Sequence, residues 1–402
     1  MTNKLMTYIF LLLRCVSYGE TWTQKANFGG TARHRTTAFA IGNKGYLGLG
    51  HINSVTNILY DDFWEYDPSS NSWTQKANYP YVCYHATGFT IGSKGYVGTG
   101  RLQDNSYTTD FFEYDPLTNT WTQVSNFPGT PRRGAVAFVV DDKGYVGTGQ
   151  TTGGGSNNFY QFDPTTNLWS QIADFPGVSR TSSVAFTIDD LGYVGTGNAG
   201  GGTTDFWAYN ASTNTWIQKA NVGSTPRQEA TGFAVNGKGY IGTGDDFSSG
   251  TNYGDFWEYD PIANSWTQIE DFAGTPRRYL AAMVIENVAY VGTGTSGANF
   301  SDFWRFDKYL NIENSTSITE IEITTYPNPA IEKITFSLET LESVENLDLT
   351  LTIFSNQGEL IDVINLNTNQ IEIERNSYAS GIYYYTIDSS IQLIKTGSFI
   401  FK

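Results

Sequence analysis

The 402-residue sequence is poor in cysteine, in positive charge and in long apolar runs. Its only cysteines are Cys15 and Cys83, so removal of the N-terminus leaves one, which excludes an intramolecular disulfide and a cysteine-based metal cluster. The net charge is −16, whereas a protein that binds along nucleic-acid phosphates needs a basic surface, so we expect no nucleic-acid partner. Beyond the first 19 residues no stretch is apolar enough for a membrane helix, and we expect no integral membrane segment.

Glycine and aromatic residues are abundant instead. There are 42 glycines, and aromatic residues make up 15% of the chain. A sequence rich in Gly, Thr, Asn and aromatic residues, with few Leu or Met, favours many short strands joined by tight turns. We therefore predict an all-β protein.

The first 19 residues have the layout of a secretory signal peptide. Lys4 precedes a predominantly apolar run over residues 5–13, and small residues follow near Ser17 and Gly19. The run is too short to cross a bilayer as a helix. We expect residues 1–19 to be a signal peptide that directs export.

Three sequence landmarks recur in six copies at intervals of about 50 residues, a spacing typical of repeat architectures. The Gly-Tyr-x-Gly-x-Gly landmark begins at Gly45, Gly95, Gly144, Gly192 and Gly239, and returns in the sixth copy with Ala289 in the first place. The x-Trp-x-Gln landmark lies at Trp22, Trp73, Trp121, Trp169, Trp216 and Trp266. An aromatic landmark, Phe-Trp-Glu-Tyr-Asp-Pro in its fullest form, begins at Phe63, Phe111, Phe159, Phe206, Phe256 and Phe303.

Each copy contains four strand-like runs, which in the second copy are 87–91, 96–98, 111–114 and 121–123. Four antiparallel strands at this period, with these landmarks, resemble the kelch repeat family, in which each repeat forms one blade of a β-propeller. The resemblance implies a six-bladed kelch β-propeller over residues 20–307.

The phase of the repeats predicts how this propeller closes. The sixth copy ends at Phe306-Asp307 without a tryptophan strand, and an unpaired tryptophan strand over residues 21–24 precedes the first copy. An open sheet edge at the junction would invite aggregation. We expect the N-terminal strand to complete the sixth blade.

The tail reads as a separate module. Residues 308–324 lose the repeat and read as a linker, and 325–402 alternate apolar and polar residues, which predicts a small Ig-like β-sandwich of about seven strands. Four segments, at 326–330, 353–358, 379–385 and 397–402, resemble the C-terminal sorting domain of type IX secretion substrates. The resemblance implies the type IX secretion machinery as a partner, and a protein that is secreted or held at the outer-membrane surface of a Gram-negative bacterium. An adhesive Ig-like module is the alternative.

Signals for catalysis are sparse. The three histidines are His34, His51 and His85, and the first and last of these fall near the start of innermost strands, where kelch repeats often carry a packing histidine. The sequence has no phosphate-binding loop, no nucleophile elbow and no zinc-binding helix. We therefore name no catalytic residue, no metal site and no cofactor.

One polar pattern repeats. An arginine lies twelve residues before the Gly-Tyr landmark in five copies, with Cys83 at this position in the second, and an acidic residue precedes the aromatic landmark in every copy except the third, which has Asn158. These arginines are Arg33, Arg132, Arg180, Arg227 and Arg277. Two interpretations are open: ion pairs that orient the loops, or a ring of guanidinium groups near the channel mouth that binds an anionic ligand. The loops over 100–109, 149–157, 197–204 and 244–254 differ between copies, as ligand-binding loops do.

These observations support two hypotheses of function. The first is a non-catalytic, exported recognition protein that binds a glycan or a protein through the loop face. The second is a carbohydrate enzyme resembling the kelch-type sialic acid mutarotases, for which Glu229 is the one acid well placed in the innermost-strand region. A purely structural surface protein is a third possibility. The ligand, the anchoring and the oligomeric state are not encoded in any recognisable motif.

Overall fold

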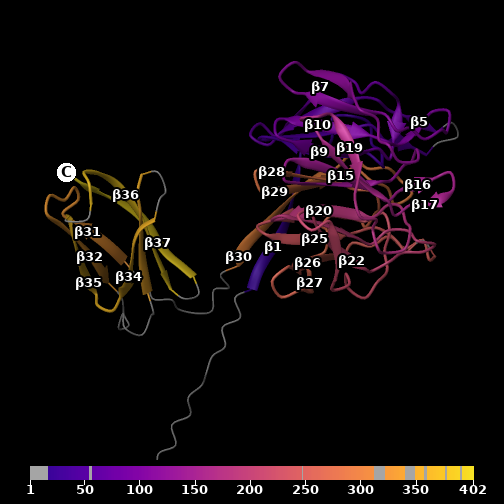
Figure 1. Cartoon of the computed structure of the whole chain (residues 1–402). Helices are drawn as coiled ribbons and strands as arrows, with labels where there is room; N and C mark the ends of the chain where they lie inside the picture. Colours follow the sequence, from indigo (N-terminus) through magenta and orange to yellow (C-terminus); the bar gives the residue numbers. More distant parts are fainter. Residues whose placement is uncertain are drawn as a thin grey trace, which may run out of the picture. The chain divides into compact units, whose positions relative to one another are not determined.

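A computed structural model of the chain describes residues 17–53, 57–246, 248–311, 322–339, 349–356, 360–375, 378–389 and 392–402. The chain divides into a compact unit over Glu20–Tyr309 and a second unit that contains Leu310–Lys402 (Figure 1). Of the predicted signal peptide, residues 1–16 lie outside the described residues, and the first strand, β1, begins at Ser17.

Six four-stranded antiparallel sheets form the first unit. From the innermost to the outermost strand, the first sheet consists of β2 (Thr37–Ile41), β3 (Lys44–Gly48), β6 (Phe63–Asp67) and β7 (Ser72–Lys76). The second consists of β9 (Thr87–Ile91), β10 (Lys94–Gly98), β12 (Phe111–Asp115) and β13 (Thr120–Val124). The third consists of β14 (Val136–Val140), β15 (Lys143–Gly147), β18 (Phe159–Asp163) and β19 (Leu168–Gln171). The next two are β20 (Val184–Ile188), β21 (Leu191–Gly195), β22 (Phe206–Asn210) and β23 (Thr215–Lys219); and β24 (Thr231–Val235), β25 (Lys238–Gly242), β26 (Phe256–Asp260) and β27 (Ser265–Ile269).

The sixth sheet combines the two ends of the repeat region. Its strands are β28 (Ala281–Ile285), β29 (Val288–Gly292), β30 (Phe303–Asn311) and, as the outermost strand, β1 (Ser17–Lys25). Figure 1 shows β1 beside β30. Backbone hydrogen bonds also join the sixth copy to the first, from Phe28 N to Ser301 O at 2.7 Å and from Gly294 N to Arg33 O at 2.9 Å.

The turn residues of each copy explain why its strands pair as they do. The innermost hairpin of the fifth sheet turns at Asn236 and Gly237, whose φ angles of 52° and 69° belong to the two-residue turn that matches the twist of antiparallel strands. The Asn that ends each Asp-Pro-x-x-Asn turn links two copies: the side-chain oxygen of Asn71 accepts from Tyr66 Oη at 2.8 Å and from the backbone N–H of Ala26 at 2.9 Å.

Aromatic side chains fill the space between neighbouring sheets. The indole ring of Trp22 on β1 is 8% exposed, and its centroid lies 5.0 Å from Phe256, 5.2 Å from Phe272 and 4.9 Å from Phe306. Burial of large rings in these tilted and edge-on arrangements is a major source of stability. The phenylalanine that opens the aromatic landmark is a core residue in all six copies, with 0–2% of each residue exposed.

Three short two-stranded sheets lie among the variable segments. They pair β4 (His51–Ile52) with β5 (Ile58–Leu59), β8 (Cys83–Tyr84) with β11 (Arg101–Leu102), and β16 (Gln150–Thr151) with β17 (Gly154–Gly155). The loops of the later copies are joined by isolated bridges, such as the one between Gln228 and Asp245.

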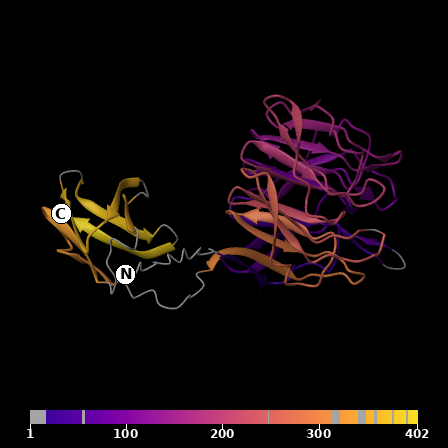
Figure 2. The same ribbon diagram turned by 90° about the horizontal axis from the view of Figure 1, so that it is seen from below.

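The second unit contains two small sheets around one core, as predicted. The sheets are β31 (Glu322–Tyr326), β32 (Lys333–Glu339) and β35 (Gln370–Glu374), and β34 (Leu360–Leu366), β33 (Leu349–Phe354), β36 (Gly381–Ser389) and β37 (Gln392–Phe401) (Figure 2). The motif segments at the two ends of this unit meet, because Ala330 N donates to Ile400 O and Lys402 N donates to Ala330 O.

Strands and turns account for the described parts of both units. No helix in those parts has the length and apolarity that a membrane crossing requires.

Candidate functional site

The five repeated arginines are buried, with 0–1% of each residue exposed. Four of them form two-pronged pairs with the aspartate of their own copy. Nη2 to Oδ2 distances are 2.9 Å for Arg33–Asp62, 2.7 Å for Arg180–Asp205, 2.6 Å for Arg227–Asp255 and 2.8 Å for Arg277–Asp302. The contacts favour the ion-pair interpretation in these four copies, because an aspartate carboxylate already occupies the guanidinium.

A further contact explains the aromatic landmark. The Trp two residues after each of these aspartates donates its indole N–H to the same carboxylate, as from Trp207 Nε1 to Asp205 Oδ2 at 2.9 Å. The matching contacts are made by Trp64, Trp257 and Trp304. The sequence contains this Asp-Phe-Trp spacing, but the spacing alone does not reveal that one carboxylate satisfies both partners.

The second and third copies break the pairing. In the second, Cys83 replaces the arginine, and Asp110 accepts from Tyr81 Oη at 3.1 Å and Asn126 Nδ2 at 2.8 Å. In the third, Asn158 replaces the aspartate. Burial without a carboxylate lowers the pKa of Arg132 to about 10.

A different ring of residues lies at the channel mouth, two positions after the buried arginine of five copies and after Cys83 of the second. The inner ring, as we name it, consists of Arg35, His85, Gly134, Ser182, Glu229 and Tyr279. All six have left-handed φ angles between 55° and 61°. Five hydrogen bonds of 2.8–3.2 Å link them, since the N–H of each member from His85 to Tyr279 donates to the carbonyl of the preceding one. This continuous chain holds an otherwise unfavourable conformation.

The inner ring and the residue that follows each member line a cavity of about 130 Å³. Below it the innermost strands line the channel with small side chains, among them Ala38, Gly88, Ala137, Ala185 and Gly232. Chemically distinct groups therefore gather at the mouth, whereas similar residues recur between copies on the strands beneath.

Arg35 is the centre of a polar network at the mouth. Its Nη1 lies 2.8 Å from His51 Nε2 and 3.3 Å from His34 Nε2, and its Nη2 donates to Tyr279 Oη. The guanidinium carbon lies 4.0 Å from the centroid of the Tyr279 ring, within cation–π range. Tyr279 Oη in turn donates to Glu229 Oε1.

Charges at the mouth are predominantly positive. Glu229 interacts electrostatically with Arg35, Arg133 and Arg278, and Asp245 pairs with Arg278. Arg101, which donates to Tyr84 Oη at 2.9 Å, is the fourth arginine near this cluster. Four arginines thus surround two carboxylates, in a protein whose net charge is −16.

Glu229 has the most strongly perturbed carboxyl group of the cluster. Burial raises its pKa to about 7, an effect that the nearby guanidinium of Arg35 only partly opposes. The carboxyl group can therefore hold or release a proton near neutral pH. No spacing in the sequence predicts this shift, which depends on burial and on charged neighbours from other copies, such as Arg35 and Arg278.

The histidines are neutral packing groups. Burial is the main cause that lowers the pKa of His34 to about 4, and it also lowers the pKa values of His51 and His85. The rings of His34 and His51 lie 4.3 Å apart, and His51 stacks on Tyr84 at 4.0 Å. Within the described part of the chain, no three His, Cys, Asp or Glu side chains are placed to hold a metal ion.

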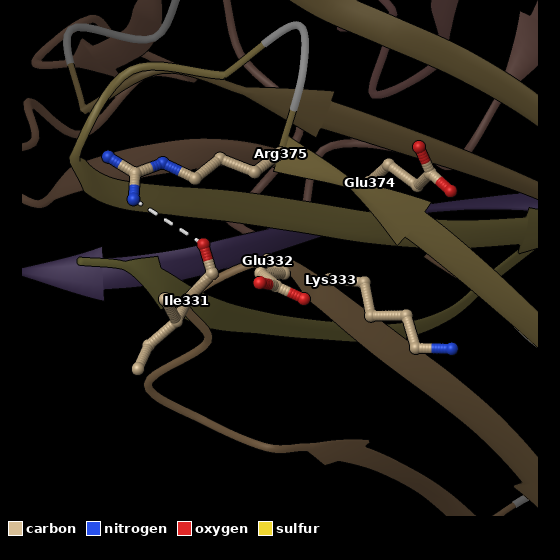
Figure 3. A pocket seen from close by; sticks show the side chains of 5 residues that line it. All are labelled: Ile331, Glu332, Lys333, Glu374 and Arg375. Atoms are coloured by element: carbon tan, nitrogen blue, oxygen red, sulfur yellow. Dashed lines mark hydrogen bonds between the residues drawn. The ribbon is translucent and has the colours of Figure 1, made fainter.

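The second unit has a larger but open hollow of about 590 Å³, lined by Ile331, Glu332, Lys333, Glu374 and Arg375 (Figure 3). The side chains in the figure diverge, and the Arg375 guanidinium turns back to the carbonyl of Ile331 at 3.4 Å. No convergent set of polar groups forms there, so the inner ring is the better candidate site.

In the sequence, the inner ring corresponds to a position at which the residue type is not repeated between copies. The arginine landmark recurs, but two residues later the six copies carry six different residue types. A ligand site breaks the symmetry of a repeat, and this criterion identifies the ring. Of its members, the sequence reasoning named only His85, as a packing residue, and Glu229, as an isolated acid.

Comparisons with known proteins agree with this architecture. Residues 36–229 match the KLHDC2/KLHL20/DRC7 Kelch-repeats domain, and residues 324–402 match the Secretion system C-terminal sorting domain. A solved structure titled "Structure of YjhT" is similar to this chain with a TM-score of 0.59 at 18% identity, over 70% of this chain and 98% of that one. No curated protein matches. The two domain matches confirm the resemblances that the repeats and the C-terminal motifs indicate, and the structural likeness supports the fold alone.

Proposed function

Because the chain is a kelch-repeat propeller followed by a secretion-system sorting domain, we propose that it is an exported recognition protein that binds a ligand at the inner ring. One observation carries this proposal: the inner ring, where the cavity lies, has six different residue types in its six copies. In a repeat protein, a change that improves packing can recur in each copy, but a ligand needs different groups at different positions.

The charges and the size of the site support an anionic group on a hydroxylated ligand. Arg35, Arg133 and Arg278 offer donors suited to a carboxylate, and Tyr279 and His85 offer ring faces for a sugar. The cavity of about 130 Å³ is smaller than the roughly 300–1,000 Å³ that encloses a drug-sized ligand. It therefore suits the terminal unit of an acidic glycan, with the rest of the ligand on the variable loops.

The sorting domain supports a site of action outside the cell. Its type implies passage through the type IX secretion machinery, and the protein then works in the medium or on the outer-membrane surface of a Gram-negative bacterium. Extracellular glycans are accessible to it in either place.

A screen of the purified protein against neutral and acidic glycans at two ionic strengths tests the proposal. We expect acidic glycans with a terminal carboxylate to bind, and their affinity to fall as salt rises, because guanidinium–carboxylate attraction in a partly open site is screened. Binding of neutral glycans only, or of no glycan at either ionic strength, would contradict it.

A second candidate function is chemistry on such a sugar by Glu229. The observation that favours it is the carboxyl pKa of about 7, since a general acid–base works best with a pKa near the operating pH. Tyr279 and the arginines would orient the substrate, and Glu229 would exchange a proton with its ring oxygen or anomeric hydroxyl. This resembles the reaction class of kelch-type mutarotases.

Exchange between the anomers of an acidic sugar, followed by NMR, separates the two candidates. An enzyme accelerates the exchange, and Glu229→Gln abolishes the acceleration without abolishing binding. A wild-type protein that binds the sugar and leaves its exchange rate unchanged is a recognition protein.

A further inference from the structure

Arg132 is a buried cation with which no carboxylate pairs in the part of the chain that the structure describes. Its Nε donates to Thr130 O at 2.9 Å, and its Nη1 donates to Thr148 O at 2.8 Å and to Ser156 Oγ at 3.3 Å. Among the described residues, none accepts a hydrogen bond from Nη2, which is buried. The residue as a whole is 0% exposed.

The fourth copy contains the carboxylate that the third copy lacks beside its arginine. There the equivalent Arg180 keeps the contacts to the backbone and also binds Asp205 through both prongs, at 2.6 and 2.7 Å. In the third copy Asn158 stands at the aspartate position and turns its Oδ1 toward Ser156 Oγ at 2.9 Å. Tyr160 stands where the fourth copy has Trp207, so the indole donor of that copy has no counterpart.

We propose that Arg132 binds one small monovalent anion, of the size of chloride, in the place that an aspartate carboxylate occupies in four other copies. A buried cation without a counter-charge is costly, and a bound anion removes that cost as the aspartates do. The Nη2 group supplies a charged donor, and the Ser156 hydroxyl can supply a second one by rotation.

In the third copy this place lies at Asn158, a residue that is partly exposed. The carboxylates that fill it in the four paired copies have side chains that are 18–22% exposed. A free ion can therefore reach the equivalent place in the third copy even though the arginine itself is covered. This site lies apart from the inner ring, and its test does not depend on the proposed function.

Thermal unfolding of the full chain at constant ionic strength, with chloride replacing the bulky anion gluconate stepwise, tests the proposal. We expect a saturable rise in Tm of about 2–4 °C in chloride, because a ligand that binds only the folded state stabilises it. Asn158→Asp supplies a covalent carboxylate, so this variant should have a higher Tm in gluconate and no response to chloride. Asp205→Asn, the matched change in the fourth copy, should lower the Tm in gluconate and enlarge the response.

A wild-type Tm that is the same in chloride and gluconate would overturn the proposal, as would a chloride response that Asn158→Asp leaves intact. Crystals soaked in bromide provide a test that needs no variant. Anomalous scattering should show a bromide ion beside Arg132 Nη2, and its absence there would also overturn the proposal.

Discussion

The guanidinium of Arg180 and the carboxylate of Asp205 share two hydrogen bonds, and the indole of Trp207 adds a third to the same carboxylate. Four of the six copies make this kind of contact, which fixes a loop onto its own sheet. Side chains two residues further along differ between copies and face the channel. The position that repeats, that of the buried arginine, therefore holds structural residues. The position two residues later, which varies between copies, holds the candidate ligand-binding residues.

Arg180→Gln tests the structural role of the buried pairs. The variant leaves the Asp205 carboxylate without its cation, and we expect a loss of about 2–4 kcal/mol in the free energy of unfolding, with or without ligand. Urea unfolding measures it. Lys238→Gln is the control: it breaks a partly exposed pair with Asp260 at 2.8 Å and should cost less than about 1 kcal/mol. Equal losses in the free energy of unfolding for Arg180→Gln and Lys238→Gln would contradict a structural role for the buried pair.

Glu229→Gln tests the protonation of the inner ring. Burial raises the pKa of Glu229 from 4.5 to about 7, so the protonated form stabilises the fold fully below pH 4.5, and this contribution is lost as the pH rises through about 7. The histidines act in the opposite sense, because a pKa of His34 lowered to about 4 removes stability as the pH falls. The difference in the free energy of unfolding between Glu229→Gln and the wild type therefore reports the contribution of Glu229, because the histidines are present in both proteins.

We expect the free energy of unfolding of Glu229→Gln, relative to that of the wild type, to rise by on the order of 2 kcal/mol between about pH 5 and about pH 8. Urea unfolding across this pH range measures it, and the exposed Glu270→Gln provides the control. A constant difference between Glu229→Gln and the wild type would show that the carboxyl group does not titrate in this range.

Two properties of single residues could not be predicted from the sequence, because they depend on packing between copies. The spacing of Arg180 and Asp205 is visible in the sequence, and ion pairing was one of its two interpretations. The burial that decides between them arises from the packing of whole sheets. The pKa of Glu229 likewise depends on neighbours from other copies, such as Arg35 and Arg278, which lie far away in sequence.

At the scale of elements, the strands follow closely from the sequence. The four runs expected in the second copy correspond to β9, β10, β12 and β13, with differences of two residues at most. Period-two alternation and turn residues such as Asn236-Gly237 are local signals, so a single sequence suffices to place them. The left-handed inner ring has no comparable signal, because five of its six members are not glycine.

Trp22→Ala tests how much the N-terminal strand β1 contributes to the propeller. Trp22 packs against Phe256, Phe272 and Phe306, and its truncation should lower the free energy of unfolding by about 3–5 kcal/mol. Ile217→Ala on the corresponding outer strand β23 is the control, since its side chain is 56% exposed. A Trp22→Ala protein as stable as Ile217→Ala would mean that β1 does not hold the ends of the propeller together.

At the scale of the whole molecule, the chain contains two compact units with different tasks. Each has its own hydrophobic core, formed in the second unit around Phe336, Leu351 and Phe399. Sequence alone separates the two units because the repeat phase ends where the tail motifs begin. It does not place the inner ring, since the six members that line its cavity come from six separate segments of the chain.

Removal of the tail tests this division. A chain that ends at residue 310 should fold and unfold with the same midpoint as the propeller of the full chain, and it should accumulate in the periplasm of the native host. Circular dichroism and cell fractionation measure the two outcomes. Appearance of the shortened chain outside the cell at wild-type levels would show that the tail is not the sorting signal.

The most direct test of the central claim is a calorimetric titration of the tightest-binding acidic glycan into three proteins: wild type, Arg278→Gln and Arg305→Gln. Arg278 lies at the channel mouth beside Glu229 and Asp245, whereas Arg305 pairs with Asp307 on β30. Both substitutions remove one positive charge, but only the first removes a proposed ligand contact. We expect a loss of affinity of about 10-fold or more for Arg278→Gln and no change for Arg305→Gln. Equal affinities in all three proteins would contradict binding at the inner ring.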